Sequence, residues 1–291
     1  MRTRRRIALL VASCAALGVA IALPASAAAA PPVIATCTPK ASTGSDSCVR
    51  GVVTAVDGSL GTAFEPIRLG TRVRSVFDPS THESTQVIIR YDDDGQINLT
   101  GIPTCPAAEV VGKNIAAAWE QCGPGADGNP SSEGNAFLST GLGPNVSGIG
   151  STVAVPGIPS GFVACTMIFK GVDNAHITIY ARAPAGNNSA TTGCNNPATN
   201  TSGTTTVVFT GTLSHQPVSS PYDWTLTVPN TQAANPALDD FYATVVRGSA
   251  FRARCMSPMK VQATWFYTPS TGDPADTVSP PYPGTTDPCP P

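Results

Sequence analysis

Two cysteines, Cys105 and Cys122, bracket the stretch of this chain that has the clearest helical pattern. A straight helix from 106 to 122 would separate its ends by roughly 24 Å at 1.5 Å per residue. A disulfide requires Cα atoms only about 5.5 Å apart. If Cys105 pairs with Cys122, this segment must therefore fold back on itself. The apolar stripe, at helical spacing, consists of Val111, Ile115, Ala118, Trp119 and Cys122.

The sequence also offers a place for the fold-back. Gly112 can end a first helical turn, because glycine tolerates the left-handed conformation, and Asn114 can cap a second helix. We therefore expect a short turn at 106–111 and a helix near 114–122. A disulfide that closes a loop of about 17 residues stabilises a fold by roughly 3 kcal/mol. Residues 105–122, here called the helical clip, are thus predicted to cover one end or face of the fold as a stability device.

The first 30 residues have the pattern of a secretory signal peptide. Four arginines precede an apolar run over 7–23, and P-A-S-A at 24–27 provides for cleavage near Ala27. A membrane helix is the alternative, but the cleavage pattern favours removal. V-A-S-C ending at Cys14 resembles a lipoprotein box, although cleavage there would leave an apolar run on the mature chain. We therefore expect a secreted or cell-envelope protein on the extracellular side, with no membrane span after cleavage.

Removal of the leader changes both the charge and the cysteine count. Lys+Arg fall from 17 to 13 against 19 Asp+Glu, for a net charge of −6. An acidic chain without a Lys/Arg block has no electrostatic basis for holding nucleic acid. The eight remaining cysteines indicate four disulfides in an exported chain. Eight cysteines can be joined into four pairs in 105 ways. Nearest-neighbour pairing gives Cys37–Cys48, Cys105–Cys122, Cys165–Cys194 and Cys255–Cys289.

The rest of the chain reads as strands and turns, which predicts a mainly β fold. Short apolar or alternating runs separated by Gly, Pro, Asn and Asp favour an antiparallel β-sandwich, with a jelly roll as one topology, and one short disulfide-clipped helix. Residues 31–267 are expected to form this single domain, and the Pro-rich residues 268–291 a tail anchored by a disulfide. A structureless loop as long as 123–150 is unusual, so we expect a short strand inside it. Strands are predicted over 52–56, 71–77, 86–91, 96–99, 152–155, 162–169, 175–183, 204–213, 223–228, 242–246 and 261–267.

The acidic run Asp92-Asp93-Asp94-Gly95 separates two of these strands, at 86–91 and 96–99. Asp and Gly favour tight turns, so the two strands are predicted to form a hairpin. A calcium loop is the alternative. The spaced ligands, twelfth-position Glu and flanking helices of an EF-hand are missing from the sequence, which favours the turn.

Several short motifs are scattered between residue 97 and Cys289. They are L-T-G-I-P-T-C at 99–105, A-A at 116–117, C-G at 122–123, A-L-D-D-F at 237–241, R-G at 247–248, R-C at 254–255 and F-Y at 266–267. In these motifs the chain resembles a broad family of exported proteins of high-GC Gram-positive bacteria with no assigned activity. The resemblance implies a β-rich, disulfide-bearing, exported protein, and it supplies no catalytic residue.

The sequence gives little support to enzymatic chemistry. It has no G-x-S-x-G nucleophile elbow, no C-x-x-C and no H-x-x-x-H, and its three histidines, His82, His176 and His215, are scattered. A glycosidase needs two carboxylates about 5–9 Å apart, and no sequence signal brings two acids together. The available acids are Glu83, Glu133, Asp173, Asp239 and Asp240.

A binding function has somewhat better support. Aromatic residues on or beside strands can stack on sugar faces, although such residues more often fill a core. Arg247, Arg252 and Arg254 form a small basic cluster, and Arg252 and Arg254 should share one strand face. A solvated face is the alternative for these arginines. The aromatic candidates are Tyr222, Trp224, Trp265 and Tyr267.

These observations favour an exported, non-enzymatic β-sandwich at the cell envelope whose partner is an extracellular glycan or protein. We expect it to need neither a cofactor nor a metal. The alternative is a secreted, glycosidase-like hydrolase that uses paired carboxylates.

Overall fold

The computed structural model of the protein is mainly β. The paired strands that it describes are antiparallel, which confirms the predicted antiparallel β-sandwich. No helix in the described ranges has the length and apolar character needed to cross a bilayer. The predicted signal peptide, with its cleavage site near Ala27, lies outside them. The structure describes residues 47–56, 59–75, 84–123, 135–138, 147–151, 162–182, 206–216, 221–229, 231, 240–245, 247, 250–257, 259–267, 277–278 and 282–285.

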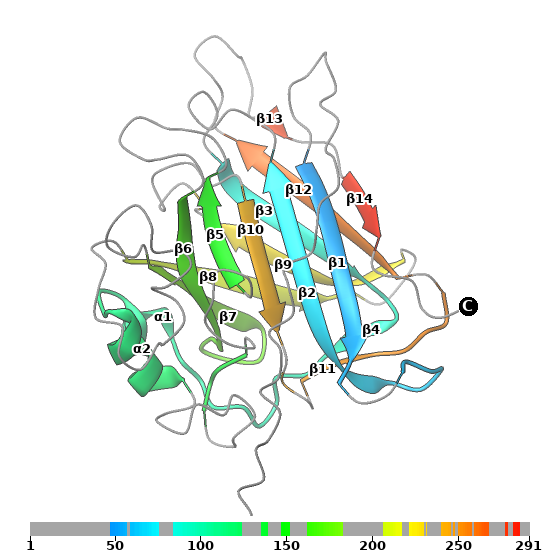
Figure 1. Cartoon of the computed structure of the whole chain (residues 1–291), viewed down its shortest axis with the longest axis horizontal. Helices are drawn as coiled ribbons and strands as arrows, with labels where there is room; N and C mark the ends of the chain where they lie inside the picture. Colours follow the sequence, from blue (N-terminus) through cyan, green and yellow to red (C-terminus); the bar gives the residue numbers. More distant parts are fainter. Residues whose placement is uncertain are drawn as a thin grey trace, which may run out of the picture.

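The described strands form one sheet that folds over into two layers (Figure 1). The front layer consists of β6, β5, β10, β2 and β1. The back layer consists of β7, β8, β9, β3 and β12. β1 lies against β12 and β14, so the folded sheet nearly closes on itself. The strands are β1 (Ser47–Ala55), β2 (Glu65–Ser75), β3 (Ser84–Asp92), β4 (Gly95–Ile97), β5 (Ser147–Ser151), β6 (Phe162–Lys170), β7 (His176–Arg182), β8 (Thr206–His215), β9 (Tyr222–Pro229), β10 (Asp240–Val245), β11 (Phe251–Ala253), β12 (Lys260–Tyr267), β13 (Thr277–Val278) and β14 (Tyr282–Thr285).

The main core lies between the two layers. Alternate residues of each strand point into it, because side chains of a β-strand alternate between faces. On β3, Val87 and Ile89 are buried and Tyr91 packs against the same cluster, while β12 contributes Val261 and Trp265. The period-two patterns in the sequence therefore identify the inward face of these strands.

The helical clip folds back as predicted, in two helices rather than one. These are α1 (Ala107–Val110) and α2 (Ile115–Cys122). Gly112 has φ +73° at the break, and the Asn114 side chain accepts a hydrogen bond of 2.8 Å from the Ala117 amide. Val111 departs from the predicted stripe: it is 61% exposed, because the break at Gly112 removes it from the face that α2 buries.

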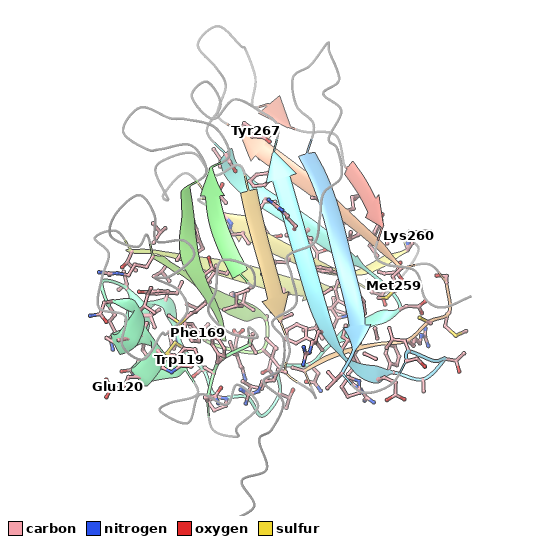
Figure 2. The ribbon with its side chains drawn as sticks, in the orientation of Figure 1. Trp119, Glu120, Phe169, Met259, Lys260 and Tyr267 are labelled. Atoms are coloured by element: carbon pink, nitrogen blue, oxygen red, sulfur yellow. A yellow bond between two sulfur atoms is a disulfide. The ribbon has the colours of Figure 1, made fainter. Side chains whose placement is uncertain are left out.

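The clip packs on the outer face of β6 and β7 (Figures 1 and 2). Ile177 and Ile179 of β7 face the main core, whereas Tyr180 faces the clip, so β7 is buried on both sides. The Tyr180 hydroxyl donates to the carbonyl of Lys113 at 2.9 Å. Trp119 of α2 packs edge-on against a neighbouring phenylalanine ring, with centroids 5.0 Å apart. The predicted role of the clip as a cover over one face is thus confirmed.

The predicted hairpin across Asp92 to Gly95 is wrong. β3 is hydrogen-bonded on one side to β12 and on the other to β9, so both of its edges are already occupied. The chain does turn at Asp93 and Asp94, but β4 then pairs with β11 instead. β11 also pairs with the first residues of β2, and this small ladder lies across one end of the sandwich.

Strands are also present in the long loop after the clip and in the Pro-rich tail. The strand expected within 123–150 corresponds to β5, and Phe137 forms an isolated bridge with Phe169. The predicted strand at 152–155 lies outside the described residues. Within the Pro-rich tail, β13 and β14 pair with β12, because backbone hydrogen bonding at a sheet edge needs no apolar pattern and tolerates Pro283.

The Cys105–Cys122 disulfide is present, with Cα atoms 5.8 Å apart. Cys255 is also disulfide-bonded. Its predicted partner Cys289 lies outside the described residues, as do Cys37, Cys194 and the side chains of Cys48 and Cys165. The pairs Cys37–Cys48, Cys165–Cys194 and Cys255–Cys289 stay predictions.

Candidate functional site

The four aromatic residues predicted to bind a ligand lie in two different places. Trp265 and Tyr267, on β12, are 1% and 2% exposed, and their rings stack with centroids 6.4 Å apart. Both therefore fill the core. Tyr222 and Trp224, on β9, are half-buried. In Figure 2, Tyr267 marks one end of β12 and Lys260 marks the other. Trp224 and Lys260 both line a cavity.

This cavity, of about 30 Å³, lies at the end of the sandwich near β4 and β11. Its lining includes Trp224 from β9, Gln96 from β4, Arg252 from β11 and Lys260 from β12, and we call these four residues the mouth. Gln96, Arg252 and Lys260 are exposed, whereas Trp224 is half-buried. The mouth thus combines one large aromatic ring with hydrogen-bond donors at the surface.

A second cavity, of about 50 Å³, lies between the layers and has an almost entirely apolar lining. The two cavities share Leu69, Tyr91, Ile97 and Phe251 as walls. One polar pair reaches this interior: the Tyr91 hydroxyl is hydrogen-bonded to Thr71, and burial raises the pKa of Tyr91 to about 12. An apolar cavity with a few placed polar groups is the usual make-up of a small-molecule site.

His215 adds an imidazole ring beside the mouth. Its ring lies against Trp224 with centroids 4.7 Å apart, and its Nε2 is 3.6 Å from Oδ2 of Asp223. His176 pairs separately, with Nδ1 2.7 Å from Oδ1 of Asp173. Alternation along β7 and β8 places the two histidines on opposite faces of the sheet, so they do not share a site.

Asp94 holds the loop that leads into β12. Its Oδ1 accepts from Nε of Arg254 at 2.9 Å, and its Oδ2 accepts from the amides of Met256 and Ser257 at 3.1 and 3.2 Å. Asp94 is 3% exposed in its side chain. The acidic turn is therefore a structural anchor whose oxygens are bound to N–H donors.

Asp92 has a similar role next to the mouth. Its Oδ1 accepts from the Asp94 amide at 3.0 Å and its Oδ2 from the Lys260 amide at 2.7 Å. Burial raises the pKa of this carboxyl to about 6, against the lowering effect of those amides. The carboxylates of residues 92–94 lie close together, but those of Asp92 and Asp94 already accept hydrogen bonds from the turn and from the segment that leads into β12.

The predicted arginine cluster is divided. Arg247 is buried and donates to Oδ1 of Asn135 at 2.7 Å. Arg252 donates to the Phe64 carbonyl, and the Arg254 guanidinium lies 4.8 Å from the centroid of the Phe64 ring. Arg252 and Arg254 thus meet around one residue, as expected for a shared face, and only Arg252 belongs to the mouth.

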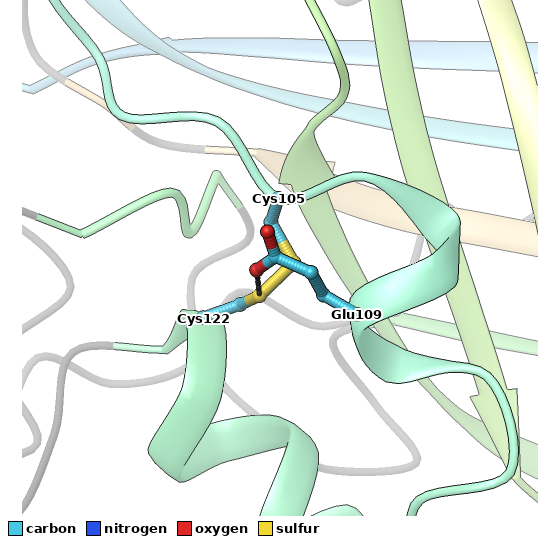
Figure 3. Close-up of side chains that lie close together, drawn as sticks. All are labelled: Cys105, Glu109 and Cys122. Carbon is cyan, nitrogen blue, oxygen red and sulfur yellow. Dashed lines mark hydrogen bonds between the residues drawn. A yellow bond between two sulfur atoms is a disulfide. The ribbon is translucent and has the colours of Figure 1, made fainter.

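Figure 3 shows a third group, formed by Cys105, Cys122 and Glu109 in the clip. The Glu109 carboxylate lies 3.8 Å from Sγ of Cys122 and accepts from Gln121 at 3.3 Å. Two thiolates and a carboxylate would suit a metal ion. Here the two sulfur atoms are bonded to each other, so neither is a thiolate and the group is structural.

The acids proposed for paired catalysis can be placed only in part. Asp173 is described, and it is paired with His176. His82 and the side chain of Asp240 lie outside the described residues, together with Glu83, Glu133 and Asp239. The paired-carboxylate alternative therefore stays a prediction.

Sequence reasoning missed most of the mouth. The sequence indicates Trp224 as a candidate and Arg252 as part of the basic cluster, but it singles out neither Gln96 nor Lys260. The alternation of Val87, Ile89 and Tyr91 could have placed Tyr91 in the interior. A search of protein-family models, of curated proteins and of solved structures finds no significant match to this chain.

Proposed function

We propose that this protein is an exported, non-enzymatic β-sandwich that binds a small amphipathic molecule at the mouth. The observation that carries the proposal is the cavity beside Trp224, which shares four wall residues with a deeper apolar cavity. A small ligand could bury an apolar group between the layers and keep its polar group among Gln96, Arg252 and Lys260. Export is supported by the leader pattern of residues 1–30 and by the disulfides.

This geometry supports a small ligand better than a flat glycan surface. A sugar-stacking site needs an exposed aromatic face, and Trp265 and Tyr267 are both buried in the core. Trp224 is half-buried, with the His215 ring against it. A ligand at Trp224 is therefore more easily accommodated as a group that enters the cavity than as a ring that stacks on a flat surface.

Saturation-transfer difference NMR on the mature protein tests the proposal. The probes are four-carbon acids, alcohols and amines on one side and mono- and disaccharides on the other. We expect signals from at least one class of four-carbon compound, and these signals should fall at least fivefold in Trp224→Ala and persist in His176→Ala. Signals from saccharides alone, or four-carbon signals that Trp224→Ala leaves unchanged, would contradict the proposal.

A further inference from the structure

The size, lining and charge of the two cavities narrow the ligand class, and this inference rests on the proposed function. The cavities of about 50 and about 30 Å³ amount together to about 80 Å³. An apolar cavity of about 150 Å³ stays dry and holds the six carbons of benzene. By that scale the two cavities together, which share four wall residues, accommodate a chain of roughly three carbons.

The lining of the deeper cavity decides which end of a ligand enters. Leu213, Leu226 and Ala243 are among its apolar walls, and its polar groups are the hydrogen-bonded hydroxyls of Tyr91 and Thr71. No lysine or arginine lines this cavity in the described residues. Burying an ionised group there is strongly unfavourable because no charged side chain of this lining compensates its charge. The apolar end of an amphipathic ligand must therefore point inward.

The mouth decides the chemistry of the polar end. Arg252 and Lys260 are cations with exposed side chains, and Gln96 adds an amide donor. The carboxylate of Asp92 also lines this cavity, but its oxygens already accept the Asp94 and Lys260 amides. The lining thus holds two cations against one carboxylate, and this positive balance favours a ligand group that accepts hydrogen bonds and carries negative charge.

We propose that the ligand is a short-chain aliphatic carboxylate of about four carbons, with its chain between the layers and its carboxylate beside Arg252 and Lys260. An alkylamine of the same length would place its ammonium next to these two cations. A neutral alcohol would fill the same space without the charge-assisted hydrogen bonds. The chain length is limited by the cavity walls, and the head group by the mouth.

Isothermal titration calorimetry with the mature protein tests this assignment. The probes are sodium butanoate, 1-butanol and butylammonium chloride at constant ionic strength, followed by acetate and octanoate. We expect butanoate to bind at least fivefold more tightly than 1-butanol, acetate or octanoate, and butylammonium to give no heat of binding. These comparisons use the unaltered chain, so they do not depend on the folding of a variant.

Two variants assign the effect to the cavities. Ala243→Leu fills part of the deeper cavity and should weaken butanoate binding at least tenfold, with thermal unfolding as the check that the variant folds. Arg252→Gln with Lys260→Gln should weaken butanoate at least fivefold and leave 1-butanol unchanged, whereas Arg68→Gln, at a half-buried position outside the lining of both cavities, is the control. If 1-butanol binds as tightly as butanoate, the carboxylate assignment is wrong and binding at the mouth stands. If none of the four-carbon probes binds, the proposed function fails as well.

Discussion

The Arg254 guanidinium donates to the buried carboxylate of Asp94 across 2.9 Å, and so ties the loop after β11 to the turn after β3. Asp94 also accepts hydrogen bonds from two backbone amides of that loop. These contacts fix the start of β12, where Lys260 stands at the mouth. Asp94 therefore shapes the candidate site without lining its cavity.

Replacing Asp94 should destabilise the fold strongly. Asp94→Ala leaves Arg254 without its carboxylate and two loop amides without acceptors, and we expect a loss of about 2–3 kcal/mol in the free energy of unfolding. Urea denaturation measures this loss. The exposed neighbour gives the control, since Asp93→Ala should change stability by less than about 0.5 kcal/mol. Equal effects of the two variants would show that Asp94 is not an anchor.

The Cys105–Cys122 disulfide should be a major source of stability for the helical clip. The double variant Cys105→Ser/Cys122→Ser opens a loop with a sequence separation of 17 residues. We expect it to lower the free energy of unfolding by about 3 kcal/mol, with hydrogen exchange of α1, α2 and β7 rising first. A loss below about 1 kcal/mol would mean that packing alone holds the clip.

The Asn114 cap offers a finer test of the same segment. Asn114→Ala removes the side-chain acceptor of the Ala117 amide and should cost about 1 kcal/mol. Glu120→Ala, on the exposed side of α2, is the matched control and should be nearly neutral. Thermal unfolding of the two variants, measured in parallel, shows whether the cap contributes more than helix propensity does.

Stability should fall with rising pH through the titration of Asp92. Burial raises the pKa of this carboxyl from 3.8 to about 6, so between those values the folded state binds the proton that the unfolded state has released. The stabilising contribution is full below about pH 4 and is lost as pH rises through about 6. In Asp92→Asn this group cannot titrate. The difference in unfolding free energy between wild type and Asp92→Asn should therefore decrease from pH 4 to pH 7, and a constant difference would contradict the raised pKa.

The local features of the fold could be predicted from the sequence. The clip depends on residues close in the chain: the Cys105–Cys122 spacing demands a fold-back, and Gly112 and Asn114 provide it. The helical spacing places Val111 on the apolar stripe of α2. That prediction is wrong because Val111 lies before the break at Gly112. The hairpin across the acidic run failed because the partners of β3, which are β12 and β9, come from distant parts of the chain.

The candidate site was less predictable for the same reason. Trp224 and Trp265 look alike in sequence, each within an alternating strand. Only the pairing of β9 and β12 within the back layer shows that the Trp224 ring is half-buried at one end of the sandwich, whereas the Trp265 ring lies in the core. Gln96 and Arg252 meet through the β4–β11 ladder, which no local pattern reveals.

Binding at the mouth can be measured most directly through the indole N–H signals of the protein. The chain has three tryptophans: Trp119 lies in the clip, Trp265 in the core and Trp224 at the mouth. In a ¹H–¹⁵N titration with butanoate, 1-butanol and butylammonium, assigned with Trp224→Phe, at least one probe should shift the Trp224 indole signal in a saturable way and leave the other two in place. A Trp224 signal that stays fixed with all three probes, or shifts confined to Trp119 or Trp265, would contradict ligand binding at the mouth.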